Sequence, residues 1–215
     1  MVRSRFVGAG AALPARIVSN LEIEDRLGLE HGWIERTGIR ARRVLGDDAT
    51  LVDLAERAAR AALETASLAP AALDAVIVAT TSGPYLFPSL ACLLHARLGL
   101  GVVPAFDNAA ACAGFPYALT IADQAIRAGD YRTVLVVGAD CLTTVVDPGD
   151  RGTATLFGDG AGAVVLRADD DAARGILACR LRALGARWET LCVPAGARRA
   201  EELAADRGGR WMRMD

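Results

Sequence analysis

The sequence contains no lysine, and all 24 of its basic residues are arginine. They are interleaved with 26 acidic residues to give a formal net charge of -2, so neither nucleic acid nor an anionic membrane is expected as a partner. The chain also lacks any run of the roughly 20 apolar residues that a membrane span requires. We interpret the missing lysine as a base-composition bias, although arginine also suits phosphate recognition better than lysine.

Paired cysteines and clustered metal ligands are missing as well. The five cysteines are widely spaced, without a CxxC pair and without nearby histidines in a metal-ligand pattern. Neither a disulfide framework nor a zinc site is therefore indicated. We expect no bound metal, and this use of cysteine suits a reducing, cytoplasmic location.

Apolar residues are abundant, at 53% of 215 residues, which is ample for a buried core. Helical spacing predicts helices over residues 50–68, about 89–98 and about 113–128. Apolar runs predict strands over residues 74–80, 102–106, 134–137, 163–166 and 176–181, and a polar loop is expected over 195–210. The elements alternate and the strands are apolar on both faces, so the fold class is α/β, with a mixed, mostly parallel sheet and helices on both faces.

Local signals mark the ends of these helices. Thr50 and Asp53 have the spacing of a capping box at the start of the first helix. The second helix is expected to start at Pro88 and Ser89 and to end at Gly99.

One cysteine stands among very small residues where a strand gives way to a helix. Cys112 follows the apolar run 102–106, and helical spacing resumes at Tyr117. Pro116 is tolerated only in the first turn of a helix, so the helix is expected to start close to Cys112. Unpaired amides and the helix dipole stabilise an anion at such a start, which favours a nucleophilic thiolate. The alternative is that Cys112 is a small buried apolar residue.

Two glycine-rich segments resemble nucleotide-binding loops only superficially. Gly8-Ala9-Gly10 lacks the third glycine of the dinucleotide motif, and Pro14 obstructs the helix that should follow. The segment GDGAG at residues 158–162 lacks the Gly-Lys-Ser/Thr ending of a phosphate loop. Close backbone packing beside a site is the interpretation that we favour for this second segment.

Taken together, several motifs resemble the β-ketoacyl-acyl-carrier-protein synthase III family of thiolase-like condensing enzymes. They occur in family order and cover nearly the whole chain: WIERTGIR at 33–40, ATTS at 79–82 leading to FPS at 87–89, the Cys112 segment, DP at 147–148 with DRGT at 150–153, and FGDGAGA at 157–163. The resemblance implies a thiolase-like layered fold, of which this chain would be the N-terminal half. Residues 1–170 would form that half, and residues 171–215 would lead to an absent C-terminal half.

The resemblance also implies a reaction and its participants. Cys112 would take an acyl group from acyl-CoA, and malonyl-acyl carrier protein would then lose CO2 and condense with it to start fatty acid or polyketide synthesis. Acyl-CoA is then a substrate, and no cofactor is expected. The family's second half supplies a catalytic histidine and asparagine, and neither His31 nor His95 matches such a position.

Binding roles follow from the same resemblance, residue by residue. Trp33 and Arg151 would stack on the adenine of CoA, while Arg36 and Thr37 would hold the nucleotide and its phosphates. Phe87 would cap the acyl pocket from the neighbouring subunit of a homodimer. Phe157 is also assigned to the acyl pocket.

Three readings of such a half remain open. It is either a fragment of the condensing enzyme, a truncated non-catalytic dimerisation or scaffold module of the same fold, or one part of a site that a separate chain completes. The apolar face that a second half normally covers would favour association in the second reading.

Overall fold

In a computed structural model, which describes residues 2–171, 173–193 and 211–214, the chain forms two compact units. The first unit comprises Met1–Pro14, Asp47–Asp140 and Gly160–Leu181. The second unit comprises Ala15–Gly46, Cys141–Asp159 and Arg182–Asp215. The division expected at residue 170 concerns the halves of a longer protein and stays a prediction.

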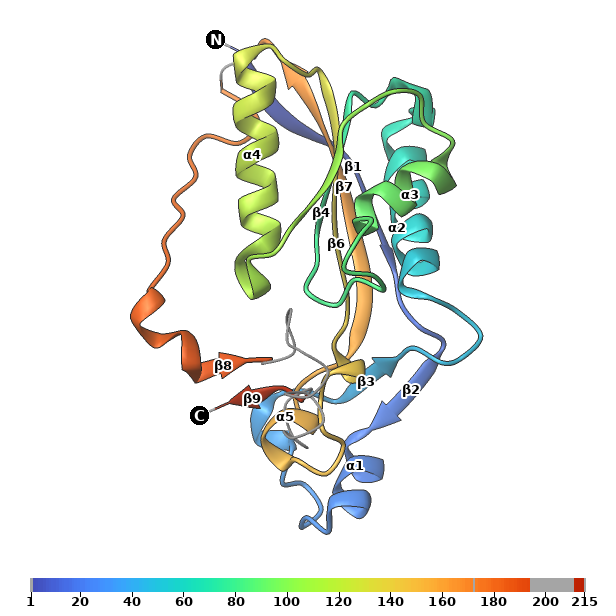
Figure 1. The fold of residues 1–215 in the computed structure, drawn as a ribbon, viewed down its shortest axis with the longest axis vertical. Coiled ribbons are helices and arrows are strands. Elements are labelled where there is room, and N and C mark those ends of the chain that lie inside the picture. The colour runs from blue at the N-terminus through green and yellow to red at the C-terminus, as the bar shows by residue number, and fades with distance from the viewer. Residues whose placement is uncertain (1, 172, 194–210, 215) are drawn as a thin grey trace. The chain divides into compact units, whose positions relative to one another are not determined.

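A five-stranded sheet in the order β1-β7-β6-β4-β5 forms the centre of the first unit (Figure 1). Its strands are β1 (Arg3–Ala12), β4 (Ala75–Ala79), β5 (Ala105–Asn108), β6 (Thr133–Cys141) and β7 (Asp159–Asp169). Strand β4 is parallel to both β5 and β6, whereas β1 is antiparallel to β7. The prediction of a mixed, mostly parallel sheet is confirmed.

Helices cover both faces of this sheet, as predicted. They are α2 (Leu51–Ala66), α3 (Leu90–Leu98) and α4 (Gly114–Ala128). Figure 1 shows α4 on one face and α2 with α3 on the other. Ile77 of β4 packs in one apolar cluster with Ala118 and Ala122 of α4, while every residue of β4 is buried. Burial on both faces explains why this strand reads as a continuous apolar run.

Side-chain and glycine caps set the helix ends. Thr50 Oγ1 accepts a hydrogen bond from Asp53 N at 3.3 Å, and the Asp53 carboxylate accepts from Thr50 N at 2.8 Å, so the predicted capping box is present. Ser89 caps α3, and Gly99 ends it in the left-handed conformation, with φ of 65°. Such positive φ angles favour glycine.

Strand β1 lies unusually close to α2. A Cβ atom at Gly8 would stand 2.1 Å from the Ala62 carbonyl oxygen, and one at Gly10 would stand 2.4 Å from that of Ala58. The two glycines therefore let a strand and a helix pack backbone to backbone. Gly8-Ala9-Gly10 therefore belongs to β1, and close packing accounts for its two glycines.

Two strand predictions need correction. The strand expected over 102–106 is displaced to β5 (Ala105–Asn108), because the backbone that pairs with β4 begins at Ala105 and continues through the polar residues Asp107 and Asn108. The prediction of a strand over 176–181 is wrong. Ile176 N donates to the Ser4 carbonyl at 2.9 Å, but the pairing does not continue into a ladder. The loop expected over 195–210 lies outside the described residues.

The second unit has shorter elements. They are α1 (Asn20–Leu27), α5 (Arg151–Ala154), β2 (Arg16–Ser19), β3 (Ala41–Val44), β8 (Leu191–Cys192) and β9 (Arg213–Met214). Strands β2 and β3 pair antiparallel, as do β8 and β9. The described residues of both units also form the short 3-10 helices η1 (Glu35–Thr37), η2 (Pro70–Ala72), η3 (Ala111–Ala113), η4 (Leu142–Thr144) and η5 (Gly185–Thr190). Among the described residues, no helix is both long and apolar enough to cross a membrane.

Candidate active site

Cys112 lies where β5 gives way to α4. The strand ends at Asn108, Cys112 occupies the middle of η3, and α4 begins at Gly114. Pro116 stands in the first turn of α4, and the side chain of Cys112 is exposed. The predicted junction is confirmed, and the alternative of a buried cysteine is wrong.

The backbone before Cys112 turns through a conformation that alanine rarely adopts. Ala111 has φ of +45°, in the left-handed region. For a residue with a Cβ atom this conformation costs about 1 to 2 kcal/mol. Strain of this kind persists where the surrounding structure fixes the turn, and here that turn leads directly to the exposed thiol.

Two polar side chains at the end of β5 fix this turn. The Asp107 carboxylate accepts hydrogen bonds from Leu90 N at 2.7 Å and Ala91 N at 2.8 Å, at the start of α3. Asn108 Nδ2 donates to the Gly114 carbonyl at 2.7 Å, at the start of α4. The strand is thereby tied to both neighbouring helices. Sequence reasoning missed these two residues because polar side chains ended the expected apolar strand.

The small residues around Cys112 have a packing reason. Gly114 is buried, and a Cβ atom there would stand 3.1 Å from Ala79 Cβ at the end of β4. A larger residue would push the first turn of α4 away from the sheet. The close approach therefore keeps the start of the helix beside Cys112.

In the second unit, the structure brings Trp33 and Arg36 together. The Arg36 Cζ atom lies 3.8 Å from the centroid of the Trp33 ring, a cation–π contact. Trp33 is half-buried, whereas Arg36 and Thr37 are exposed in η1. Thr37 Oγ1 donates to the Ile34 carbonyl at 2.8 Å and accepts from Ile39 N at 3.1 Å. The segment thus presents an aromatic ring and a cation at the surface.

Arg151 is exposed at the first position of α5. Asp150 caps this helix and accepts hydrogen bonds from Thr153 Oγ1 at 2.6 Å and from Gly152 N at 3.0 Å. The Thr153 hydroxyl is the largest cause that lowers the pKa of Asp150, and the two backbone amides of the cap act in the same direction. The cap fixes the turn that carries Arg151.

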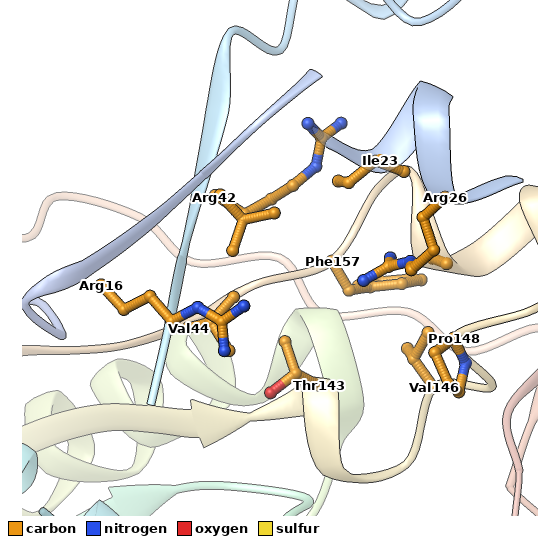
Figure 2. A pocket seen from close by; sticks show the side chains of 11 residues that line it. Arg16, Ile23, Arg26, Arg42, Val44, Thr143, Val146, Pro148 and Phe157 are labelled. Carbon is orange, nitrogen blue, oxygen red and sulfur yellow. The ribbon is translucent and has the colours of Figure 1, made fainter. Parts of the chain in front are cut away.

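Phe157 lines a pocket of about 210 Å³ in the second unit (Figure 2). The pocket has apolar walls together with Arg16 from β2, Arg26 from α1 and Arg42 from β3. Phe87 belongs to the first unit, where its side chain is 84% exposed. The roles of both phenylalanines in an acyl pocket stay predictions.

Two buried or half-buried aspartates were missed by sequence reasoning. Asp159, in the GDGAG segment, accepts hydrogen bonds from Leu45 N at 2.8 Å and from Thr143 N and Oγ1 at 3.0 and 2.6 Å. Asp140 Oδ1 accepts from Thr81 N at 2.8 Å and Ser82 Oγ at 2.7 Å. The sequence carries no local signal for either residue, because Asp159 is flanked by glycines and Asp140 by Ala139 and Cys141. Each aspartate organises the loop that leads from a strand to a predicted site residue.

Neither histidine lies in a catalytic arrangement. His31 pairs with Asp25 through Nε2 and Oδ1 at 2.8 Å, and His95 Nε2 bonds to the Gly101 carbonyl at 2.7 Å. Within the part of the chain that the structure describes, no group of potential ligands is arranged to hold a metal ion.

The mixed, mostly parallel sheet with helices on both of its faces defines a thiolase-like fold, and the exposed cysteine lies at a helix start within it. Comparisons with known proteins agree. The family 3-oxoacyl-[acyl-carrier-protein (ACP)] synthase III matches residues 106–185, which include Cys112. A curated relative, the β-ketoacyl-[acyl-carrier-protein] synthase III of Xanthomonas campestris pv. campestris, is 48% identical over 196 residues, covering 91% of this chain and 60% of the relative.

Solved structures give the same result. The 3-oxoacyl-[acyl-carrier-protein] synthase III of Aquifex aeolicus superposes with a TM-score of 0.88 at 40% identity, covering 99% of this chain and 64% of that one. The priming β-ketosynthase of the R1128 polyketide pathway has a TM-score of 0.74 at 42% identity, covering 78% and 51%. The chain is therefore similar to the 3-oxoacyl-[acyl-carrier-protein] synthase III enzymes, and it spans about 60% of the length of the curated relatives that it matches.

Proposed function

We propose that this chain carries the nucleophile of a condensing enzyme of the 3-oxoacyl-[acyl-carrier-protein] synthase III type. The Cys112 thiolate attacks the carbonyl carbon of acyl-CoA, the bond from that carbon to the CoA sulfur breaks, and CoA leaves as a thiolate that takes up the proton that Cys112 had lost. The acyl group then rests on Cys112 as a thioester. Malonyl-acyl carrier protein loses CO2, and its carbanion attacks this thioester to release a 3-oxoacyl product.

The geometry of Cys112 is the observation that carries this proposal. Its exposed thiol stands at the start of α4, a helix of 15 residues. At the start of a helix, unpaired backbone amides and the helix dipole favour negative charge. The bonds made by Asp107 and Asn108 hold the turn, so the nucleophile is positioned before substrate arrives.

For the acyl donor, we propose acyl-CoA held by Trp33, Arg36, Thr37 and Arg151. An exposed aromatic ring suits an adenine base, and arginine suits phosphate because its planar guanidinium donates two parallel hydrogen bonds. No cofactor is needed, since acyl-CoA is the substrate. A cytoplasmic location is part of this proposal and is supported by the spacing of the cysteines.

Among the described residues, neither His31 nor His95 is arranged for the condensation step. In the family, a histidine and an asparagine of the second half stabilise the carbanion, and one oxyanion donor also comes from there. Losing one such donor typically costs about 10²- to 10³-fold in rate. We therefore expect acyl transfer to Cys112 without efficient condensation. The proposal covers the start of fatty acid synthesis and of polyketide synthesis, since a polyketide priming enzyme is among the similar structures.

Intact-protein mass spectrometry after incubation with acetyl-CoA tests the proposal. The wild-type chain should gain the mass of one acetyl group, and Cys112→Ser should not. Cys92→Ser, which alters another exposed cysteine of the first unit, is the matched control and should acylate like the wild type. A folded wild-type chain that gains no mass would refute acyl transfer by this chain alone.

A dimerisation module is the second candidate, and the loop after β4 favours it. Tyr85, Leu86 and Phe87 are 63%, 87% and 84% exposed, an arrangement of apolar side chains that marks interaction sites. We propose that this loop contributes to a homodimer and that Phe87 limits the length of the acyl primer. Sedimentation should show a dimer that Phe87→Ala weakens, and this variant should accept longer acyl-CoA chains. A monomeric wild type would count against the module.

A further inference from the structure

A buried arginine connects the two elements that carry the predicted CoA-binding residues. Arg42, in β3, is 5% exposed. Its Nη2 atom donates to the Thr155 carbonyl at the end of α5, and its Nη1 atom donates to Asn20 Oδ1 at 2.5 Å. Asn20 Nδ2 in turn donates to the Ile39 carbonyl at 2.7 Å. A continuous chain of hydrogen bonds therefore runs from the segment just after η1 to the end of α5.

The α5 end of this chain reaches the backbone of Arg151. Thr155 Oγ1 donates to the Arg151 carbonyl at 2.8 Å, so the residue that Arg42 holds is itself bonded to Arg151. A lysine at position 42 has one nitrogen in place of a planar fork, and it cannot hold both Asn20 and Thr155 in the same geometry. Arginine is therefore required for the bridge, whereas a positive charge alone is insufficient.

A buried glutamate holds the turn that carries Trp33. Glu24 is 2% exposed, and its carboxylate accepts hydrogen bonds from Gly32 N at 3.1 Å and Ile34 N at 2.9 Å. These two amides flank Trp33 in the chain. The ring is thus presented from a backbone that is fixed on both sides.

Glu24 and Arg42 also compensate one another electrostatically. Burial lowers the pKa of Arg42 from its usual range, and the negative charge of Glu24 raises it again. The Arg42 Nε atom is buried without a hydrogen-bond partner. Burying two charges is less favourable for stability than burying apolar residues of similar volume. We therefore explain Glu24 and Arg42 by the backbone segments that they hold in place.

We propose that Arg42 and Glu24 are the positioning residues of the nucleotide-binding surface: Arg42 sets the position of Arg151 relative to η1, and Glu24 fixes the turn that presents Trp33. This inference rests on the proposed role of Trp33, Arg36, Thr37 and Arg151 in binding CoA. Neither positioning residue need touch the substrate. Both act through the backbone that carries the binding side chains.

Calorimetric titration of the full chain with CoA tests this, with Arg42→Lys as the main variant. We expect the Kd for CoA to rise about tenfold, since a bridge of two hydrogen bonds to a charged group is lost. Acylation of Cys112 by acetyl-pantetheine, which lacks the nucleotide, should keep its rate. Arg40→Lys, an exposed arginine in the same segment, is the matched control and should leave both measurements unchanged.

Amide hydrogen exchange tests the positioning role in a way that does not depend on CoA. Arg42→Lys should speed amide exchange both in residues 36–39 and in residues 151–155, and Glu24→Gln should speed it at Gly32 and Ile34. Glu24→Gln keeps the volume of the side chain, so it serves as the second variant if Arg42→Lys folds poorly.

The outcomes separate the inference from the proposed function. If Trp33→Ala and Arg151→Ala bind CoA like the wild type, the binding assignment fails, and the exchange data alone decide whether Arg42 links the two segments. If those variants lose affinity but Arg42→Lys does not, the positioning role is overturned. The positioning role would also be overturned if Arg42→Lys weakened CoA binding and slowed acylation by acetyl-pantetheine to the same extent. That result would indicate a general loss of structure.

Discussion

The two units place their functional side chains by different physical means. In the first unit, apolar strands and small residues bring backbones together, and Gly114 against Ala79 is the close contact beside Cys112. In the second unit, buried charged groups organise short elements, with Glu24 and Arg42 as examples. A site built on packing should fail when atoms are added, whereas one built on buried polar groups should fail when a single hydrogen-bonding atom is exchanged.

Adding one methyl group to the first unit should have the largest effect. In Gly10→Ala, the new Cβ atom would stand 2.4 Å from the Ala58 carbonyl oxygen and 2.5 Å from Ala62 N, so β1 and α2 must separate. We expect the free energy of unfolding to fall by about 3 kcal/mol or more. Urea denaturation measures this. Gly101→Ala, where nothing lies within 4 Å, is the control, and an equal loss there would contradict the packing argument.

Exchanging one hydrogen-bonding atom in the second unit should have the second-largest effect on stability. Asp159→Asn replaces a carboxylate oxygen by an amide group that cannot accept, which leaves one of the donors at Leu45 or Thr143 unpaired. We expect the free energy of unfolding to fall by about 2 kcal/mol. Chemical denaturation together with hydrogen exchange at these two residues checks it. Asp147→Asn, at an exposed turn, is the control and should change the free energy of unfolding little. If Asp159→Asn were as stable as the wild type, the role of buried polar groups would be refuted.

Removing a methyl group beside Cys112 should have the opposite sign. Ala111 has a positive φ, so Ala111→Gly relieves strain and should raise the free energy of unfolding by up to about 1 kcal/mol. Differential scanning calorimetry would show this as a higher Tm. Ala110→Gly, at a negative φ of -120°, should instead lower the Tm slightly. Destabilisation by both changes would mean that Ala111 stores no strain.

The capping box of α2 should give the smallest effect and a dependence on pH. Thr50 donates to the Asp53 carboxylate and lowers its pKa, so this stabilisation is present above the ordinary carboxylate pKa of about 4. It is lost as the pH falls through the lowered value. Asp53→Asn should cost about 0.5 to 1 kcal/mol at neutral pH, and the difference should shrink in acid.

Thermal unfolding of wild type and variant from pH 7 to pH 3 measures that difference. Asp48→Asn, at an exposed position before the helix, is the control and should follow the wild type. A gap between wild type and Asp53→Asn that stays constant with pH would show that the capping box does not depend on the charge of Asp53.

Sequence reasoning succeeded where the signals are local. The predicted starts and ends of α2, α3 and α4 are close to the observed ones, because caps such as Thr50, Ser89 and Gly99 act within one turn of their helix. The strand-to-helix junction at Cys112 was found for the same reason. Proline and small residues restrict the backbone wherever the rest of the chain lies.

It failed where distant partners decide the structure. Asp107 and Asn108 are strand residues because they pair with β4, and their side chains also bond to α3 and α4; nothing in the local pattern shows these partners. Glu24, Arg42 and Asp159 look like ordinary charged residues, and only their burial reveals what they hold. An apolar run at Ile176 was mistaken for a strand, since pairing depends on a neighbour that periodicity cannot identify.

The pairing of β1 with β7 has a consequence for synthesis on the ribosome. Arg3 lies opposite Asp169, so the first strand to emerge waits for one of the last. At ordinary elongation rates that delay is about 10 to 30 seconds. Helix α2 leaves the ribosome much earlier and can pack on the glycine face of β1, so that this face of the strand is covered while the rest of the sheet is made. Any change that slows this early pairing would expose an unpaired strand to the crowded cell.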